Sequence, residues 1–279
     1  ASWPQAGVPA GLVLASAVLA ALAYFLTDAE FEAWGWRVPF LISSVLVVIG
    51  WWIRVAVSES HTFEAAASAA ESPPKAPALD VIRERPMAVL IGSGLRVGEN
   101  ISYYIITVFS ITYMVEMAHL ERATALNAIL IGSILQFFII PSAALLSDRI
   151  GRRPVYALGG LGLAAFVFVF FPMLASGNVA LVIAAIVLGM ALHGIMYGPQ
   201  AAFIAELFPT RIRYSGASIA YQLTSIVAGS LAPIIALALY QRTGSAVPVA
   251  IYVAVACAIS GITALLARET KGLELSAIQ

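Results

Sequence analysis

Long, nearly uncharged apolar runs recur along the whole chain, and this feature limits the possible folds more than any other. A helix that crosses a bilayer needs about 20 mostly apolar residues. Eight runs of this kind are present, at residues 5–26, 38–56, 87–116, 123–147, 155–175, 179–203, 215–240 and 247–267. Membrane-spanning strands would instead alternate apolar and polar positions over about ten residues. The sequence therefore predicts an all-α membrane protein with eight transmembrane helices.

The composition agrees with this prediction, since 61% of the 279 residues are hydrophobic and only 11% are charged. In a soluble domain about a quarter of the residues are charged. The formal net charge is zero, which gives no indication of nucleic-acid binding. One cysteine, Cys257, and three histidines in separate segments make no disulfide framework, metal site or catalytic constellation. We therefore expect no metal, no cofactor and no enzymatic activity.

Lysine and arginine are divided unequally between the two sets of connections that join the apolar runs. Eleven fall on one side and three on the other, while Arg96 lies within a run. Because cytoplasmic connections carry the excess of positive charge, the first side is predicted to be cytoplasmic, and an even number of spans places both chain ends there. The eleven are Arg54, Lys75, Arg83, Arg85, Arg149, Arg152, Arg153, Arg211, Arg213, Arg268 and Lys271, and the three are Arg37, Arg122 and Arg242.

The longest cytoplasmic connection, residues 57–86, is rich in Ala, Ser, Pro and Glu. This composition is typical of a partly amphipathic or flexible linker without a core of its own. The linker separates residues 1–56, with two spans, from residues 87–279, with six. Six spans form one half of transporters that are built from two 3+3 inverted-repeat halves. We therefore expect the first two spans to end an N-terminal half whose other four spans precede this chain.

The short connection Ser147-Asp-Arg-Ile-Gly-Arg-Arg153 concentrates charge between two apolar runs. Arginines at a membrane boundary need no special role. However, an acidic residue before them, a glycine that permits a tight reversal and Pro154 at the start of the next helix indicate more than a boundary. Asp148 can accept hydrogen bonds from a helix N-terminus or pair with an arginine. We interpret this connection as a latch between two helices.

This connection resembles the D-R-x-G-R-R signature of the major facilitator superfamily, in its second-half copy. Ala205–Gly216 is similar to the E-x-F-P-T-x-x-R connection two spans later, and Trp34–Phe40 and Ala1–Pro9 resemble segments of the metabolite:proton symporter branch. The resemblance covers the whole chain as spans five to twelve of a twelve-helix fold. It implies alternating access, in which two six-span halves rock about a central site and cytoplasmic loops latch the outward-facing state. The implied latch residues are Asp148, Arg149, Gly151, Arg152, Arg153, Glu206 and Arg211.

The third run places two ionisable residues, Arg96 and Glu99, near mid-bilayer at a rise of about 1.5 Å per residue. Residues three or four apart share a helix face, so the two can neutralise each other, and Asn100, Tyr103 and Tyr104 extend this polar stripe. One interpretation is an ion pair that fixes helix packing. In the other, which we favour because ionisable groups in spans are costly, Arg96 holds a substrate carboxylate and Glu99 carries a proton.

The sixth run carries a second polar stripe, with residues spaced by four and three: His193, Tyr197 and Gln200. We include it in the predicted substrate and proton site, although a lone membrane histidine is more often a packing group. Gln136, Tyr221 and Gln222 are weaker candidates, because ordinary hydrogen bonds between helices explain them equally well. The Phe166–Phe171 run is expected to face lipid.

These features predict a secondary transporter that couples a small organic solute to protons across a bacterial cytoplasmic membrane. Arg96 favours a solute that is a carboxylate or a zwitterion. The implied partners are this solute, the proton, the lipid bilayer and the N-terminal spans of the full-length carrier. A non-transporting membrane sensor or an inactive truncated remnant is the alternative, because half of the substrate cavity would belong to those N-terminal spans.

Overall fold

The structure is a computed structural model that describes residues 3–56 and 77–272. It forms two compact units, a smaller one at Ala10–Lys75 and a larger one that joins Ala1–Pro9 to Ala76–Gln279. All regular structure in the described ranges is helical, which confirms the predicted all-α class. Most of the predicted linker lies outside the described residues, and its last part, Pro77–Glu84, is helix α5.

The smaller unit contains most of α1 (Trp3–Phe25), then α2 (Asp28–Ala33), the 3-10 turn η1 (Gly35–Arg37) and α3 (Val38–Ala56). A capping box begins α2, because the Thr27 hydroxyl accepts from the Glu30 N–H and the Glu30 carboxylate accepts from the Thr27 N–H. Arg37 lies over the ring of Trp36, with its Cζ 4.3 Å from the ring centre.

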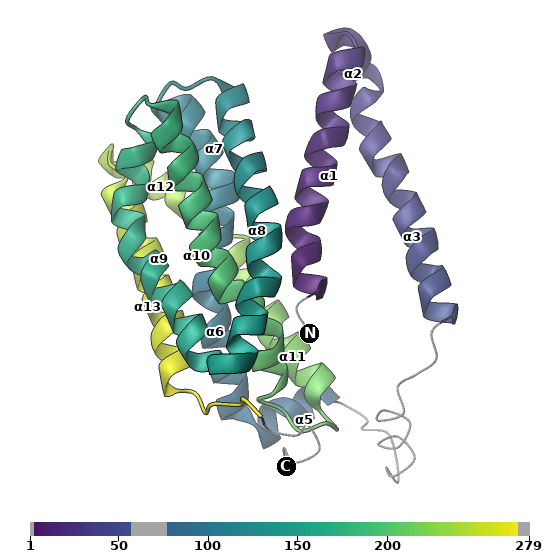
Figure 1. Ribbon diagram of the computed structural model, residues 1–279, viewed down its shortest axis with the longest axis vertical. Coiled ribbons are helices and arrows are strands. Elements are labelled where there is room, and N and C mark those ends of the chain that lie inside the picture. Colours follow the sequence, from purple (N-terminus) through teal and green to yellow (C-terminus); the bar gives the residue numbers. More distant parts are fainter. Residues whose placement is uncertain (1–2, 57–76, 273–279) are drawn as a thin grey trace. The chain divides into compact units, whose positions relative to one another are not determined.

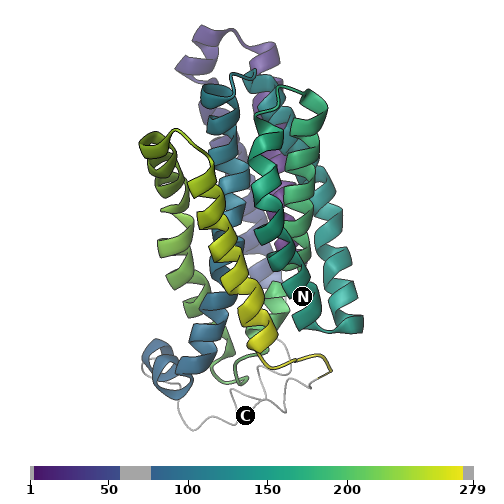
Figure 2. The same ribbon diagram turned by 90° about the vertical axis from the view of Figure 1, so that its left-hand side faces the viewer.

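The larger unit is a helical bundle (Figures 1 and 2). Its helices are α5, α6 (Pro86–Tyr104), α7 (Ser110–Thr112), α8 (Arg122–Ile150), α9 (Arg152–Leu174), α10 (Val179–Ala205), α11 (Arg213–Thr224), α12 (Ala232–Thr243) and α13 (Val247–Leu266). The π-helical turns η2 (Ile105–Phe109) and η3 (Tyr113–Met117) flank α7, so the chain is helical without a break from α6 to Met117. A third π-helical turn, η4 (Ser225–Gly229), lies between α11 and α12. Such turns often mark functional sites.

Six helical segments of the described residues are long and apolar enough to cross a membrane. They are η1 with α3, α8, α9, α10, the segment from α11 to α12, and α13. The other two predicted spans, at residues 5–26 and 87–116, are helical but are not among the six. The count of eight spans therefore stays a prediction.

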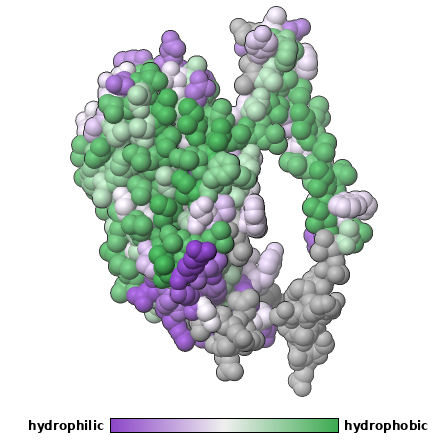
Figure 3. All heavy atoms as spheres, in the orientation of Figure 1, coloured by the Kyte–Doolittle hydropathy of each residue, from purple (hydrophilic) through white to green (hydrophobic). Residues whose placement is uncertain are grey.

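The side of the bundle seen in Figure 3 is largely apolar, with some hydrophilic residues at its upper end and a larger group of them at its lower end. Exposed apolar side chains include Phe138 on α8, Leu158 on α9 and Leu188 on α10. A soluble monomer rarely exposes apolar patches of this extent. The surface is therefore suited to lipid.

The expectation that Phe166–Phe171 faces lipid is wrong for three of its residues, one of which is Val167, at 3% exposure. Phe168 is 49% exposed, but Phe170 and Phe171 are each only 2% exposed. The ring of Phe171 packs on Tyr113, with 5.3 Å between ring centres. Successive residues of a helix point in different directions, so a run of six aromatic and aliphatic residues includes both faces.

Glycines allow helices of the bundle to approach closely, as small residues do in membrane proteins. A Cβ at Gly159 of α9 would lie 2.5 Å from the backbone nitrogen of Met196 and 2.8 Å from the carbonyl oxygen of Leu192, both on α10. At Gly162, one turn later, a Cβ would meet only the end of the Leu192 side chain, at 3.0 Å. The α9–α10 contact therefore depends on Gly159 more than on Gly162.

Replacing Gly159 with alanine is expected to push α9 away from α10, because backbone atoms cannot move aside as a side chain can. Overpacking of this kind costs about 1–3 kcal/mol. Thermal unfolding of the detergent-solubilised full-length protein should show a lower melting temperature for Gly159→Ala than for the matched Gly162→Ala. Equal melting temperatures for the two variants would contradict this account.

Candidate functional site

The polar stripes of α6 and α10 face each other inside the larger unit. Arg96 Nη1 lies 2.6 Å from Glu99 Oε2 and 3.0 Å from Gln200 Oε1. The other carboxylate oxygen, Glu99 Oε1, lies 3.3 Å from His193 Nε2. The ion pair predicted within α6 is therefore present, and two residues of α10 extend it across the helix interface.

Helix α8 contributes Gln136, whose side chain is 1% exposed. Its Nε2 lies 2.8 Å from His193 Nδ1 and 3.2 Å from the carbonyl oxygen of Met190. The sequence pattern ranked Gln136 as a weaker candidate. The structure places it in the same cluster as Glu99, through His193.

Helix α9 contributes Tyr156, which the sequence pattern does not single out. Its ring is fully buried, and its hydroxyl donates to the carbonyl oxygen of Leu95 and accepts from Gln200 Nε2 at 3.0 Å. A tyrosine near the first turn of a span is common at membrane interfaces, so its position alone gave no reason to select it. Tyr156 holds Gln200, and Gln200 in turn contacts Arg96.

Helix α11 and the turn η4 enclose the other side of Arg96. Its Cζ lies 4.1 Å from the ring centre of Tyr221, within the range of a cation–π contact. Ser225 Oγ lies 3.4 Å from Arg96 Nη2 and 3.3 Å from Asn100 Nδ2. A Cβ at Gly229 would lie 2.1 Å from Asn100 Oδ1, so any side chain there would have to displace the Asn100 amide. A serine and a glycine in an apolar run carry no periodic signal, and the sequence pattern singles out neither.

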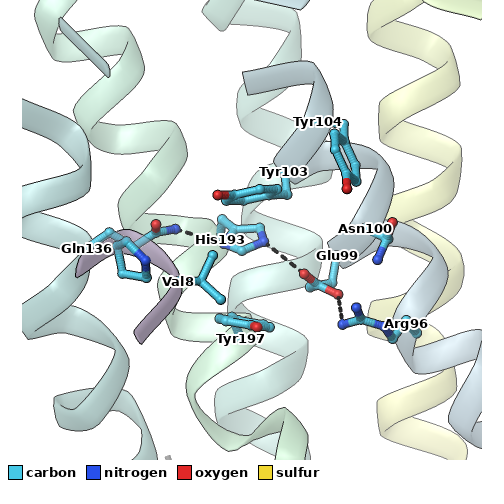
Figure 4. Close-up of a pocket in the computed structure, with 10 residues that line it drawn as sticks. Val8, Arg96, Glu99, Asn100, Tyr103, Tyr104, Gln136, His193 and Tyr197 are labelled. Carbon is cyan, nitrogen blue, oxygen red and sulfur yellow. Dashed lines mark hydrogen bonds and ion pairs between the residues drawn. The ribbon is translucent and has the colours of Figure 1, made fainter. Parts of the chain in front are cut away.

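A cavity of about 180 Å³ lies among these side chains (Figure 4). Its lining includes every residue of the predicted substrate and proton site except Gln200. Figure 4 shows His193 between the rings of Tyr103 and Tyr197, with ring centres 5.4 Å away on each side. Tyr104, 38% exposed, is the outermost member of the α6 stripe.

The cluster combines a buried ion pair with polar atoms that have bonding capacity left. Glu99 is 4% exposed, so its charge depends on the donors around it. Arg96 Nε and Asn100 Oδ1 are buried without a hydrogen-bond partner among the described residues. Buried polar groups are normally paired, so this arrangement suits a polar ligand. Within the described ranges, no group of three or more His, Cys, Asp or Glu side chains is placed to hold a metal ion.

A second charged cluster forms where α8 meets α9, at the lower end of the bundle in Figure 1. Arg152 forms an ion pair with Asp148, and its Nη2 lies 3.3 Å from Glu206 Oε1. Its Nη1 also donates to Ser147 Oγ at 2.8 Å. Three of the predicted latch residues, Asp148, Arg152 and Glu206, are therefore in contact.

The segment after α13 completes this cluster, which the sequence pattern did not predict. Glu269 accepts hydrogen bonds from the backbone N–H groups of Arg152 and Arg153, at 2.9 and 3.1 Å, and so caps the start of α9. The Thr270 hydroxyl donates to Glu206. Arg268 and Lys271, which flank Glu269 and Thr270, were counted among the positive charges of the connections. However, the sequence around a single glutamate after the last span does not indicate which residue it will contact.

Gly151 makes room for this cap. Its φ is +114°, a left-handed conformation, and a Cβ there would lie 2.6 Å from Glu269 Oε2. Burial raises the pKa of the Glu269 carboxyl, but hydrogen bonds from backbone N–H groups, with Arg152 first, outweigh it, so the pKa is lowered overall. The cap therefore contributes its full stability above the ordinary glutamate pKa of about 4.3. That contribution is lost as the pH falls through the lowered pKa.

The remaining predicted latch residues are placed less centrally. Arg153 donates from its side chain to the carbonyl oxygen of Leu265. Arg149 contributes its own carbonyl oxygen, which accepts from the Lys271 ammonium. Arg211 lies apart from the cluster, because its Nη2 pairs with Glu84 of α5 at 2.6 Å.

Sequence comparison relates the chain to membrane transport proteins. Residues 64–279 match the sugar (and other) transporter family. The inner membrane metabolite transport protein YhjE of Escherichia coli is 36% identical over 275 residues, which cover 97% of this chain and 62% of that protein. The Escherichia coli shikimate transporter is 35% identical, over 97% of this chain and 62% of that protein. The proline/betaine transporter of the same species is 28% identical, over 96% of this chain and 55% of that protein. The chain thus spans less than two thirds of the length of these relatives.

Proposed function

The chain belongs to the sugar (and other) transporter family of the major facilitator superfamily, and from this premise we propose that the full-length protein is a proton-coupled symporter of a small organic solute in the bacterial inner membrane. The family is one of membrane transporters rather than enzymes. The observation that carries the proposal is the buried cluster of Arg96, Glu99 and His193 beside the 180 Å³ cavity.

The arrangement of this cluster supports coupled binding of an anion and a proton. Arg96 is shared between Glu99 and Gln200, so a carboxylate that enters the cavity competes with Glu99 for it. When Glu99 takes up a proton, it loses its charge and releases Arg96 to the solute. Binding both together keeps the buried charge balanced, which a low-dielectric interior strongly favours. Solute and proton are therefore expected to bind cooperatively.

The solute is proposed to carry a carboxylate, alone or in a zwitterion. A guanidinium presents a planar pair of donors that matches a carboxylate. The names of two relatives mention shikimate, and proline and betaine, all of which carry a carboxylate. The tyrosines around the cavity would contact the rest of the solute.

Eight spans are proposed for this chain, as spans five to twelve of a twelve-span carrier with both ends of the chain cytoplasmic. Besides the six apolar segments, α1 has 23 helical residues, and residues 86–117 are helical throughout, about 48 Å at 1.5 Å per residue. Arg96, Glu99 and Asn100 reduce the apolarity of the second of these segments. The excess of arginine and lysine on one side supports the orientation.

The cluster of Asp148, Arg152 and Glu206 is proposed as the cytoplasmic latch of alternating access, with Glu269 and Thr270 as further members. It joins the start of α9, the end of α10 and the segment after α13. Breaking it would free these three cytoplasmic ends from one another. Arg149 and Arg211 are peripheral to it.

The proposal is tested by uptake into proteoliposomes that contain the full-length protein, with a panel of radiolabelled organic acids and zwitterions and an imposed inward proton gradient. Accumulation of one of them, abolished by a protonophore, is the expected result. Uptake that is unchanged by the protonophore would indicate a facilitator rather than a proton-coupled symporter. A folded protein that transports none of the panel would favour a non-transporting sensor or a remnant.

Replacing Arg96 with lysine tests the carboxylate contact. Lysine keeps the charge but cannot contact Glu99, Gln200 and a solute carboxylate from one planar group. We expect the apparent KM for the solute to rise about tenfold, which corresponds to about 1.4 kcal/mol, in measurements of initial uptake rate against solute concentration. Arg242→Lys, at an exposed position in the last turn of α12, is the matched control. A KM that is the same in both variants would remove Arg96 from the substrate site.

A further inference from the structure

The orientation of the Gln136 amide is determined by its surroundings. Its Nε2 lies 3.2 Å from the carbonyl oxygen of Met190 and 2.8 Å from His193 Nδ1 (Figure 4). A backbone carbonyl can only accept a hydrogen bond. If the amide were turned over, its oxygen would face the Met190 oxygen, and two buried acceptors would be in contact. Met190 therefore holds the NH2 group of Gln136 toward α10, as the hydrogen-bond network requires.

This orientation determines the tautomer of His193. The NH2 group has two hydrogens, one directed at Met190 and the other at Nδ1 of His193. Nδ1 must then accept, so it carries no hydrogen. A neutral imidazole has one N–H, which is therefore on Nε2. An imidazolium would put a second hydrogen on Nδ1, against the NH2 group of Gln136, so Gln136 also opposes full protonation of His193.

The Nε2–H of His193 is directed at Glu99, whose Oε1 lies 3.3 Å away. The other oxygen of the carboxylate accepts from Arg96 at 2.6 Å. Both oxygens of Glu99 thus face donors, and an arriving proton must displace one of them. The contact with His193 is the longer of the two. His193 cannot turn Nε2 into an acceptor for that proton without giving up its hydrogen bond from Gln136.

The other charged and titratable groups around Glu99 and His193 do not fix the tautomer of His193 as Gln136 does. Helix α8 brings only the uncharged Gln136 to the pair. The other helices contribute Arg96, Tyr103 and Tyr104 from α6, Tyr156 from α9, Tyr197 from α10, Tyr221 from α11 and Cys257 from α13. Phenols and thiols are ordinarily protonated at neutral pH. Arg96 is therefore the one permanent charge beside Glu99 and His193 among the described residues.

We propose that Gln136 is a positioning residue of the proton site: it holds His193 neutral, with its hydrogen on Nε2 directed at Glu99, and thereby sets the pH at which Glu99 takes up its proton. The second part of this proposal, the control of the pH at which Glu99 takes up its proton, rests on the proposed proton coupling. The tautomer is a property of the folded protein and can be measured without transport.

The tautomer is tested by nitrogen NMR on the full-length protein labelled with [15N]histidine, with the His193 signals identified by their loss in His193→Asn. Protonated and unprotonated ring nitrogens differ widely in chemical shift. At neutral pH we expect Nδ1 unprotonated and Nε2 protonated. In Gln136→Met, which keeps the length of the side chain, the Nδ1–H form should appear. Ser133→Ala is the control, since Ser133 is buried one turn earlier on α8 and its hydroxyl donates to Ile129 of the same helix.

Uptake provides the second measurement. In Gln136→Met, Nε2 of His193 becomes free to accept from a protonated Glu99, so the midpoint of uptake against pH should move by about one unit toward alkaline pH, a tenfold change in proton binding. Ser133→Ala should keep the wild-type midpoint.

Two results would overturn the assignment: a hydrogen on Nδ1 of His193 in the wild type, or a tautomer unchanged in Gln136→Met. The expected tautomers together with an unshifted uptake midpoint would refute the control of Glu99. The expected tautomers in a protein whose uptake ignores the proton gradient would support the positioning role and overturn the proposed symport.

Discussion

Glu99→Gln is expected to abolish solute accumulation in the full-length carrier while solute still equilibrates down its own gradient. With one proton per solute, the wild type can accumulate solute about tenfold for each unit of imposed pH difference. The glutamine has nearly the same shape, but it cannot take up and release a proton. Accumulation should therefore fall to the equilibrium ratio whatever the pH difference.

Solute counterflow and gradient-driven uptake, measured on the same proteoliposomes, separate these two activities. Counterflow needs only the alternation of the loaded carrier, so it should persist in Glu99→Gln, whereas gradient-driven uptake should not. Glu116→Gln is the matched control, because Glu116 lies in η3 on the same continuous helical segment but is exposed. Unaltered pH dependence in Glu99→Gln would remove Glu99 from the proton pathway.

The parts of the site that the sequence predicted are those that lie within one helix. Arg96 and Glu99 are three residues apart, so the geometry of a helix alone brings them together, and their charge distinguishes them in an apolar run. The same reasoning placed His193, Tyr197 and Gln200 on one face of another helix. Sequence spacing carries no information on which face of α10 meets which face of α6. The contact of Glu99 with His193 is therefore visible only in the structure.

Two neutral members of the cluster were ranked low or missed for a related reason: Gln136 was only a weaker candidate, and Ser225 was not singled out. Gln136 and Ser225 have the residue types of ordinary hydrogen bonds between helices, and nothing in their neighbours along the chain distinguishes them. Their positions depend on how α8 and η4 pack around α6. The latch shows a similar division between residues close in sequence and distant ones, except that the family resemblance also implied Glu206. Asp148 and Arg152 are four residues apart and were predicted, whereas Glu269, more than a hundred residues later, was not.

Arg152→Gln is expected to open the cytoplasmic end of the carrier. Removing the Arg152 guanidinium leaves Asp148 and Glu206 without the cation that lies between them. An unpaired, largely buried charged group costs about 1–3 kcal/mol or more, and Glu206 is the more buried of the two, since Asp148 is half exposed. Each 1.4 kcal/mol changes an equilibrium about tenfold. We therefore expect the inward-open population to rise about tenfold and uptake to fall.

Cysteine labelling at Ala202 measures this opening, because Ala202 lines a cavity of about 260 Å³ beside Asp148 and Arg152. In an Ala202→Cys protein with Cys257 replaced by alanine, a membrane-impermeant thiol reagent applied from the cytoplasmic side should react about tenfold faster when Arg152 is glutamine. Arg268→Gln removes an exposed charge from the same region and should leave the rate unchanged.

Two possible causes of faster labelling can be distinguished: an unpaired carboxylate and unfolding at the start of α9. Glu269 caps α9 through the backbone N–H groups of residues 152 and 153, and glutamine at position 152 keeps its N–H. If the opening arises from an unpaired carboxylate, adding Glu206→Gln to Arg152→Gln should restore slow labelling in part. If α9 frays instead, the second substitution should have no effect, because it leaves the cap as it was. Faster labelling that Glu206→Gln does not reduce would therefore contradict a latch based on the pairing of Arg152 with Glu206.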